Sequence, residues 1–371
     1  MIADPASVAY LDYNASAPLR PEARAAMVTA LATFGNPSSV HAAGRAARAQ
    51  IESSREAVAA AVGGDPAGVI WTSGATEANN QALAALPSTA CLAAAVEHPS
   101  VLALVAPHAR IAVGGDGLID LDDLNRRIAG LPAPFVVAVQ LVNNETGVIQ
   151  PVRAVAERVK ARGGLVHCDA VQALGRIPVD LRTLDVDTLA VSAHKIGGPK
   201  GVGALVARPG LTIAPMLRGG GQERSRRAGT ENVPAIAGFG AAVSSLPRML
   251  ADQPRLAAMR DDLEIFIARE CPQALIHGRT APRVANTTCL SLPHRSSEMQ
   301  LIALDLAGVA VSSGSACSSG KVAASHVLAA MGVSDPHLKG ALRISTGWAT
   351  TAGDLDRFKQ AWASLVREQA A

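Results

Sequence analysis

The sequence LVHCD at residues 165–169 and the sequence TLAVSAHK at residues 188–195 each consist of an apolar run followed by polar side chains. A continuous apolar run is typical of a strand that is buried on both faces of a parallel sheet. Five further runs share this character, at residues 69–71, 91–96, 110–113, 135–142 and 202–206. Helical stretches alternate with them, as at residues 45–62, 75–86 and 151–162. The alternation predicts an α/β fold with a mostly parallel, seven-stranded sheet in the middle of three α/β/α layers.

The last third of the chain has a different pattern. After Gly229 comes an Ala-rich helical region, and beyond it strands are expected at residues 287–292, 309–312 and 342–345 and a closing helix at 354–368. This mixture predicts a smaller α+β domain. We therefore expect a large domain over residues 14–250 and a small C-terminal domain over residues 251–371, which the N-terminal segment 1–13 joins.

The composition excludes several classes of protein. Of the 371 residues, 49% are hydrophobic and 18% charged, which suits a packed core and not a disordered chain. A net charge of +3 and an aromatic content of 3% argue against a nucleic-acid partner. Neither a secretory signal nor an apolar run of membrane-spanning length is present, so no membrane association is expected. The five scattered cysteines form no CxxC pair, which predicts no metal site, no disulfide framework and a cytoplasmic location.

Polar turns follow four of the predicted strands, at residues 72–77, 143–147, 169–172 and 192–195. In an open parallel sheet, ligands bind beyond the carboxyl ends of the strands. The four turns should therefore meet at one edge of the sheet and form one site.

The turn at Ser73–Thr76 leads from a strand into a helix, where free N–H groups and the helix dipole can bind phosphate. An ordinary N-cap by Thr72 or Ser73 would explain the same residues. Asp169 ends a buried apolar run, where a carboxylate needs a cationic partner such as a protonated pyridine nitrogen. A helix N-cap is the alternative role for Asp169.

Lys195 is one of six lysines in a chain that otherwise uses arginine. Arginine cannot lose its proton in proteins, so it cannot form a Schiff base, whereas lysine can. A solvated surface lysine is the alternative. Together, a phosphate-binding turn, an aspartate facing a pyridine nitrogen and a Schiff-base lysine describe a site for pyridoxal 5′-phosphate.

The chain resembles the cysteine desulfurases of the NifS/IscS type, a class-V aminotransferase-like family. The resemblance rests on many motifs in the family's order, among them LDYN (11–14), FGNPSS (34–39), TSGATE (72–77), EH (97–98), VNNETG (142–147), HCDAVQ (167–172), SAHKIGGP (192–199), RGGGQER (218–224), GT (229–230) and SSGSAC (312–317). It implies a homodimeric, fold-type I transferase that converts L-cysteine to L-alanine. The sulfur would remain on Cys317 as a persulfide and pass to an acceptor protein, such as a scaffold for iron–sulfur cluster biosynthesis.

The resemblance also implies roles for individual residues. Lys195 would carry the cofactor, Asp169 would face the pyridine nitrogen and His98 would stack over the ring, although a lone histidine at a strand end is more often structural. Asn144 and Gln172 would lie near the ring hydroxyl. The phosphate would be held by Ala75, Thr76, Ser192 and His194 of one subunit. Thr230 would reach it from the partner subunit. Arg343, assisted by Asn14, would bind the substrate carboxylate.

Cys317 lies among Gly and Ser residues, so its thiol should be exposed and able to react. A phosphate loop over Gly314–Lys321 is the competing interpretation. It fails because five residues separate the two glycines and Val322 replaces the required Ser or Thr. The arginines at 218, 224, 226 and 227 form the densest basic cluster, which we expect to be a mobile loop at the dimer interface.

Related activities remain open on the sequence alone: another pyridoxal-phosphate lyase or aminotransferase of the same fold, a selenocysteine lyase, or a non-catalytic sulfur-relay protein. The intact set of Asp169, Lys195, Cys317 and Arg343 argues against the non-catalytic alternative. This chain ends at Ala371, directly after the last predicted helix, whereas housekeeping IscS-type members carry a longer C-terminal tail that helps to dock a scaffold protein. The sequence alone therefore leaves the sulfur acceptor open.

Overall fold

The seven predicted strands form one sheet. A computed structural model describes residues 8–313 and 324–370 of the chain. The strand order is β2 (Val69–Thr72), β8 (Gly203–Ala207), β7 (Thr188–Ser192), β6 (Leu165–Asp169), β5 (Val136–Gln140), β3 (Cys91–Ala94) and β4 (Arg110–Ile111). All neighbours are parallel except β8, which runs antiparallel to both β2 and β7. The prediction of a mostly parallel, seven-stranded sheet is confirmed, and β3, β4 and β5 are shorter than expected.

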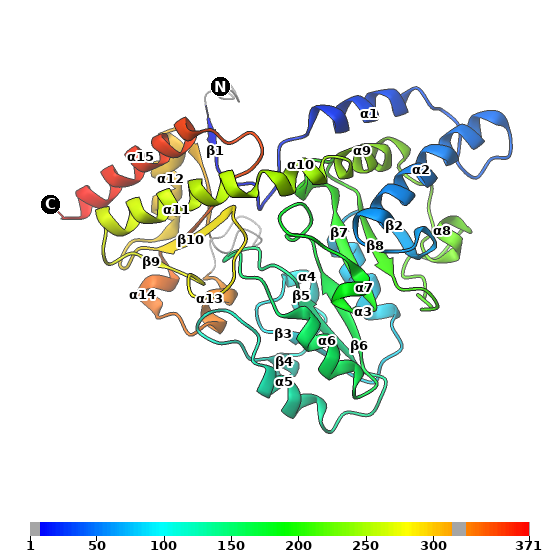
Figure 1. Ribbon diagram of the computed structural model, residues 1–371, viewed down its shortest axis with the longest axis horizontal. Coiled ribbons are helices and arrows are strands. Elements are labelled where there is room, and N and C mark those ends of the chain that lie inside the picture. The colour runs from blue at the N-terminus through cyan, green and yellow to red at the C-terminus, as the bar shows by residue number, and fades with distance from the viewer. Residues whose placement is uncertain (1–7, 314–323, 371) are drawn as a thin grey trace.

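Helices cover both faces of this sheet (Figure 1). One face carries α3 (Ala75–Ala85) and α4 (Pro99–Leu102), and the other carries α2 (Ala42–Ala61), α5 (Leu121–Ile128), α6 (Val152–Lys160) and α9 (Val233–Val243). The side chains of β5 alternate between the two hydrophobic clusters: Val136 and Ala138 join one, Val137 and Val139 the other. Burial on both faces explains why the strands read as continuous apolar runs.

A second, smaller unit contains the C-terminal part of the chain. Its antiparallel sheet has the order β12 (Ser312–Ser313), β13 (Ala341–Ser345), β10 (Thr287–Ser291) and β9 (Leu275–Ile276). The N-terminal strand β1 (Ala9–Tyr10) pairs in parallel with β11 (Val309–Ala310). Around these strands lie α11 (Gln253–Glu270), α12 (Ser297–Leu306), α13 (His326–Ala330), α14 (Asp335–Leu338) and α15 (Ala352–Ala370).

This unit has its own hydrophobic cluster, which includes Leu11, Leu263, Ile344 and Trp362. A separate core supports a division of the chain into two domains. The predicted boundary at about residue 250 stays a prediction. The remaining helices are α1 (Pro21–Leu31), α7 (Leu181–Leu184), α8 (Gln222–Ser225) and α10 (Leu246–Ala251). In Figure 1, α9, α10 and α11 follow one another from the large sheet to the small unit. Within residues 8–313 and 324–370, no helix is both long and apolar enough to cross a membrane.

Candidate active site

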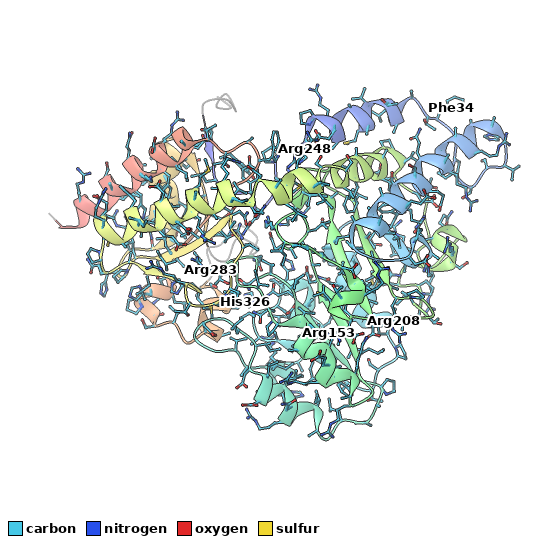
Figure 2. The ribbon with its side chains drawn as sticks, viewed as in Figure 1. Phe34, Arg153, Arg208, Arg248, Arg283 and His326 are labelled. Carbon is cyan, nitrogen blue, oxygen red and sulfur yellow. The ribbon has the colours of Figure 1, made fainter. Side chains whose placement is uncertain are left out.

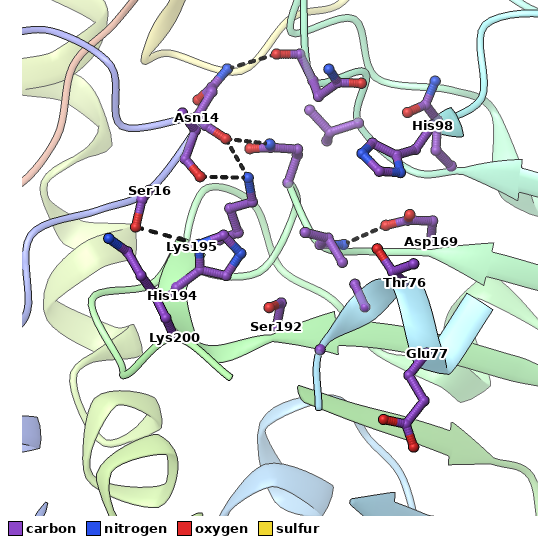
Figure 3. A pocket seen from close by; sticks show the side chains of 18 of the residues that line it. Asn14, Ser16, Thr76, Glu77, His98, Asp169, Ser192, His194, Lys195 and Lys200 are labelled. Atoms are coloured by element: carbon purple, nitrogen blue, oxygen red, sulfur yellow. Dashed lines mark hydrogen bonds between the residues drawn. The ribbon is translucent and has the colours of Figure 1, made fainter. Parts of the chain in front are cut away.

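A cavity of about 490 Å³ opens at the carboxyl ends of β6 and β7. All four polar turns predicted from the sequence contribute to its lining, and so do Asn14, His98 and Arg343. The predicted convergence on one sheet edge is therefore confirmed. Figure 3 shows Lys195, His194 and Ser192 on one side of this cavity and His98, Asp169 and Thr76 on another.

The N-terminus of α3 forms one end of the cavity. The helix begins after Gly74 and has no side-chain cap, so the expected alternative of an N-cap by Thr72 or Ser73 is wrong. Thr72 instead donates from its hydroxyl to the carbonyl oxygen of Gly74 at 2.9 Å. The first-turn N–H groups of Ala75 and Thr76 have no acceptor within the helix, which leaves them for an anion.

Gly203 allows this helix end to approach the sheet closely. A Cβ at Gly203 would lie 2.7 Å from the carbonyl oxygen of Val191 and 2.9 Å from the backbone of Gly74. Only glycine fits between these two backbones without displacing one of them. The glycine at the start of β8 therefore helps to place the anion-binding turn next to the end of β7.

Glu77 lies in the first turn of α3, yet its charge is already paired. It accepts a 2.7 Å hydrogen bond from the Ser73 amide and a 2.9 Å ion pair from Arg227. Burial alone would raise the pKa of Glu77, but the hydrogen bonds from Arg227 and Ser73 hold it below its usual value. The Arg227 guanidinium thus offsets the negative charge of Glu77 at the cavity wall, which reduces its repulsion of an incoming anion.

His194 and Lys200 lie on the Lys195 side of the cavity, across from Thr76 (Figure 3). Burial, with the charges of Lys195 and Lys200, lowers the pKa of His194 to about 4, so its imidazole is neutral at physiological pH. Lys200 was not predicted as a site residue. Its spacing of five residues from Lys195, across a Gly-Gly-Pro turn, is the signal that could have found it.

Asp169 is held by two hydrogen bonds. Its Oδ2 accepts from Asn79 Nδ2 at 2.7 Å, and its Oδ1 accepts from the amide of Val171 at 3.0 Å. No helix begins at this residue, so the alternative role of helix N-cap is wrong. These two hydrogen bonds fix the orientation of the Asp169 carboxylate, which lines the cavity.

A hydrogen-bonded chain behind Asp169 fixes the orientation of Asn79. The Oδ1 of Asn79 lies 3.0 Å from His167 Nε2, and His167 Nδ1 lies 2.9 Å from the hydroxyl of Thr188. Burial lowers the pKa of His167 to about 4, so the ring is neutral. Because the amide oxygen of Asn79 can only accept, the single ring proton of His167 sits on Nε2.

His98 faces the cavity from the start of α4. Its Nδ1 accepts from the amide of Ser100 at 3.1 Å, which leaves the ring proton on Nε2 when the imidazole is neutral. Burial lowers the pKa of His98, and the charge of Lys195 acts in the same direction against that of Asp169. The hydroxyl of Ser100 joins His98 Nδ1, at 2.8 Å, to Asn79 Nδ2, at 2.9 Å. One amide therefore links the supports of His98 and Asp169.

Lys195 lies at the end of a single helical turn, Ala193–Lys195, directly after β7. Its Nζ donates to the carbonyl oxygens of Asn14 at 2.5 Å and Ala15 at 2.9 Å. The side chain is half-buried and its amine reaches the cavity rather than open solvent (Figure 3). The alternative of a solvated surface lysine is therefore wrong.

Arg343 enters the cavity from β13 of the smaller unit. Its guanidinium pairs with Asp12 Oδ1 at 2.8 Å and donates to the carbonyl oxygen of Asn144 at 3.0 Å. Its Nε is buried and has no partner among the described residues. The Asn14 side chain is bonded to Thr287 and to the Asn144 carbonyl. Asn14 is thus part of the cavity framework, with its backbone carbonyl toward Lys195.

These residues fit pyridoxal phosphate. The cavity has an anion-binding end at α3, an amine at Lys195, and a carboxylate and an imidazole at Asp169 and His98. The side-chain oxygen of Asn144 is buried without a hydrogen-bond partner in the described part of the chain. An acceptor left unpaired at a cavity wall is costly unless a ligand supplies a donor. These groups match the parts of pyridoxal phosphate: the N-terminus of α3 suits the phosphate, the Lys195 amine suits the aldehyde, and Asp169 and His98 suit the protonated, flat ring.

Among the described residues, one predicted site residue, Thr230, does not line this cavity. Thr230 is exposed and lines a neighbouring cavity of about 210 Å³, which shares Ser73 and Gly201 with the first. Cys317 lies outside the described residues. Of the cysteines within them, Cys168, Cys271 and Cys289 are buried, as a structural role requires. Cys91 is only partly buried.

The basic cluster is tied to the fold more closely than expected. Arg227 pairs with Glu77, and Arg226 donates to the carbonyl oxygen of Val69 at 3.1 Å. Glu223, in the same segment, is buried, and its carboxylate accepts hydrogen bonds from NH1 and NH2 of Arg55 at 2.8 and 2.7 Å. These contacts anchor residues 223–227, although arginines in a Gly-rich loop usually remain in solvent.

The comparisons with known proteins agree with this geometry. A family model described as aminotransferase class-V matches residues 9–358. A cysteine desulfurase of Cereibacter sphaeroides is 41% identical over 373 residues, which cover 96% of this chain and 95% of that protein. A cysteine desulfurase of Trichormus azollae is 38% identical, with 97% and 93% covered. The structure of a NifS-like protein from Rickettsia africae ESF-5 has a TM-score of 0.90 at 32% identity, over 97% of this chain and 99% of that one. These matches confirm the resemblance drawn from the motifs: the chain belongs to the class-V aminotransferases, a family of pyridoxal-phosphate-dependent enzymes of the fold-type I class.

Proposed function

We propose that the protein is a cysteine desulfurase. It converts L-cysteine and the thiol of Cys317 into L-alanine and a Cys317 persulfide, so the carbon–sulfur bond of the substrate is replaced by a sulfur–sulfur bond on the enzyme. The observation that carries the proposal is the meeting of Lys195, Asp169 and Arg343 at one cavity. The 41% identity to a cysteine desulfurase over nearly the whole chain supports it.

The residues around the cavity suggest how the cofactor is held. Lys195 forms the covalent link, Asp169 accepts the pyridine N–H and neutral His98 packs over the ring. Asn144, whose side-chain oxygen has no partner among the described residues, and Gln172 would hydrogen-bond the ring hydroxyl. The phosphate is held by the N-terminus of α3, at Ala75 and Thr76, together with Ser192 and His194.

Once released by the substrate, the Lys195 amine removes the proton from the α-carbon of cysteine and later returns a proton to the product. When bound, pyridoxal phosphate supplies an electron sink that makes this proton removable. The ionised Asp169 keeps the pyridine nitrogen protonated, which that role requires. Lys195 emerges from the rigid end of β7, so the amine is positioned before the substrate arrives.

Arg343 binds the substrate carboxylate. Its unpartnered Nε and its place in the cavity lining suit a hydrogen bond to a carboxylate. Asp12 holds the other side of the guanidinium at 2.8 Å and fixes its plane. Asn14 assists through its contact with the Asn144 carbonyl, which Arg343 shares.

Cys317 attacks the substrate sulfur as a thiolate. Cys91, Cys168 and Cys289 are poor substitutes, because burial raises the pKa of Cys91 to about 11 and raises those of Cys168 and Cys289 further. A thiol with a raised pKa supplies almost no nucleophilic thiolate at neutral pH. The persulfide sulfur then passes to an acceptor protein, for which an iron–sulfur scaffold is one candidate, in a reducing compartment such as the cytoplasm.

The active unit is a homodimer in which Thr230 of the partner subunit completes the phosphate site. Thr230 of the same chain lies in the adjacent cavity, so it faces outward from its own site. The end of α1 and the loop between α1 and α2 expose a group of apolar side chains: Leu31 is 69% exposed, Val40 87% and Phe34, labelled in Figure 2, 92%. Exposed apolar side chains of this size are typical of a surface that a partner covers.

One experiment tests the proposed function directly. The purified protein is examined by absorbance and supplied with L-cysteine, and alanine and sulfide are measured with and without a thiol reductant. A yellow protein should form alanine from cysteine, with continuous sulfide release only when the reductant regenerates the Cys317 thiol. A colourless protein, or one that forms keto acid instead of alanine, would refute the proposal.

A further inference from the structure

Arg176 is a buried cation without an acidic partner. It is 7% exposed and lies four residues after Gln172, in the segment that follows β6. Among the described residues, no carboxylate lies within ion-pair distance of its guanidinium, whereas buried Arg55 and Arg343 pair with Glu223 and Asp12. An uncompensated buried charge is expensive for a fold to keep. Such a charge calls for a role beyond core packing.

The guanidinium of Arg176 is directed at two residues of the active site. Its NH1 donates to both the backbone and the side-chain oxygen of Gln172 at 2.5 Å, and its NH2 donates to Asn14 Oδ1 at 3.1 Å. Gln172 in turn donates from Nε2 to the backbone oxygen of Asn14 at 2.9 Å. The same oxygen accepts the Nζ of Lys195 at 2.5 Å. Arg176 is therefore connected to the Lys195 amine through Asn14 directly, and also through Gln172 followed by Asn14.

Arg176 and Lys195 also share a small cavity of about 40 Å³ behind the active site. On this side Lys195 faces Tyr13, Arg20, Arg176 and Asp252, and on the other side it faces Glu77, His98, Asp169, His194, Lys200 and Arg343. Most of these groups are neutral or paired: Arg343 with Asp12, Glu77 with Arg227, and Asp252 with Arg255. Among the described residues behind Lys195, Arg176 is the charged group without an oppositely charged partner. Its hydrogen bonds go only to the neutral residues Asn14 and Gln172.

We propose that Arg176 is a positioning residue that keeps the Lys195 amine uncharged and aimed into the cavity, by holding Asn14 and Gln172 and by placing a positive charge behind them. A nearby cation disfavours a second cation on Lys195. Burial and the charge of Arg343 lower the pKa of Arg176 to about 9, so it remains charged at neutral pH. The inference rests on the proposed function, because it assumes that Lys195 is the residue that links the cofactor.

The test is a pH titration of the lysine-linked cofactor absorbance in holoenzyme. Wild type is compared with Arg176→Gln, Arg176→Met, Arg176→Lys and the surface control Arg182→Gln, whose side chain is 76% exposed. Both neutral variants should raise the titration midpoint by about one pH unit, because a buried cation has been lost. Arg176→Lys should titrate close to wild type, and Arg182→Gln should not differ from it.

A second readout follows the reaction of the Lys195 amine with pyridoxal phosphate in apoenzyme. Apoenzyme of each neutral variant should capture added pyridoxal phosphate about tenfold more slowly at neutral pH, since one pH unit changes the uncharged fraction tenfold. An unchanged midpoint in a folded neutral variant would overturn the role of Arg176 alone. Unfolding of both neutral variants would reduce Arg176 to a structural residue and overturn it too. Absence of the absorbance from wild type, or its persistence in Lys195→Ala, would instead overturn the proposed function.

Discussion

The Nδ2 of Asn79 lies 2.7 Å from Oδ2 of Asp169, and the same nitrogen lies 2.9 Å from the hydroxyl of Ser100, which supports His98. Asn79 is fully buried on α3 and its oxygen faces His167. A single amide thus connects the carboxylate and the imidazole that we place on the cofactor ring. Because α3 also supplies the anion-binding turn, one helix sets three features of the site.

Replacing Asn79 with Ala should weaken cofactor retention and lower stability by roughly 2 kcal/mol, because hydrogen bonds to a charged group and to a neutral histidine are lost inside the core. Equilibrium dialysis of pyridoxal phosphate and urea denaturation measure the two effects. Asn80→Ala is the matched control, since the Asn80 amide reaches only the backbone oxygen of Ser100. Equal cofactor affinity in the two variants would contradict the role given to Asn79.

Lys195→Ala should abolish the absorbance of the lysine-linked cofactor and cysteine turnover, even if pyridoxal phosphate still binds. Lys200 lines the same cavity and offers a second amine, so Lys200→Ala is the control. It should retain the absorbance and lose some cofactor affinity, because the cavity lining loses a positive charge that attracts an anionic ligand. Spectra recorded after borohydride reduction and peptide mapping identify the modified lysine. Label on Lys200 would reverse the assignment.

The apolar runs predicted the sheet well because burial on both faces leaves a clear pattern in the sequence. The short strands β1, β9 and β12 left no such pattern, since strands of two residues have no periodicity to detect. Strand ends also shifted: the run at residues 135–142 forms hydrogen-bonded strand only over Val136–Gln140. Beyond Gln140 the chain turns to present Asn144 to the cavity.

The cavity-lining residues were predictable where a polar turn follows a strand, as for Asp169 and Lys195. Asn79 and Arg176 were not predictable, because each acts through partners that are distant in the sequence. Asn79 meets Asp169 across 90 positions, and Arg176 meets Asn14 across 162. Spacing and composition carry no information about such contacts, which depend on how α3 and the N-terminal segment pack.

Arg343→Ala should raise the KM for cysteine strongly and leave the resting cofactor spectrum unchanged. Loss of a charged hydrogen-bond partner costs roughly 2–5 kcal/mol, or tens- to thousands-fold in affinity. Asp12→Asn is the control, because it removes the ion pair and leaves the guanidinium in place. Its KM should rise far less. A near-normal KM in Arg343→Ala would leave Arg343 as a structural residue of β13.

The Glu145 carboxyl should make stability depend on pH. Burial raises its pKa to about 7 from the usual 4.5, against the opposing effects of Ser325 and Arg343. A raised folded-state pKa gives stability that is fully present below pH 4.5 and is lost as the pH rises through 7. The loss amounts to roughly 3 kcal/mol.

Glu145→Gln removes this titration and should flatten the stability profile across that range, as measured by urea denaturation at stepped pH. Glu157→Gln is the control, because Glu157 is an exposed helix residue paired with Arg153. Parallel profiles for wild type and Glu145→Gln would show that Glu145 does not titrate in this range.

Cys317→Ala tests the feature that separates a desulfurase from other enzymes of its family, which is the need for a protein thiol. Cofactor binding and removal of the α-proton depend on Lys195 and Asp169, so this variant should still change the cofactor absorbance when cysteine is added. Alanine and sulfide should fall to near background, because the substrate sulfur has no acceptor. In wild type, mass spectrometry after one turnover should find one added sulfur on the peptide that contains Cys317.

Cys91→Ala is the matched control, because Cys91 is the most accessible cysteine among those described. Burial raises its pKa to about 11, so less than a thousandth of this thiol is ionised at neutral pH. Its replacement should leave alanine formation at the wild-type rate. If Cys317→Ala continued to form alanine while Cys91→Ala did not, the persulfide would belong to Cys91. If both variants remained active, the enzyme would be a lyase that needs no protein thiol.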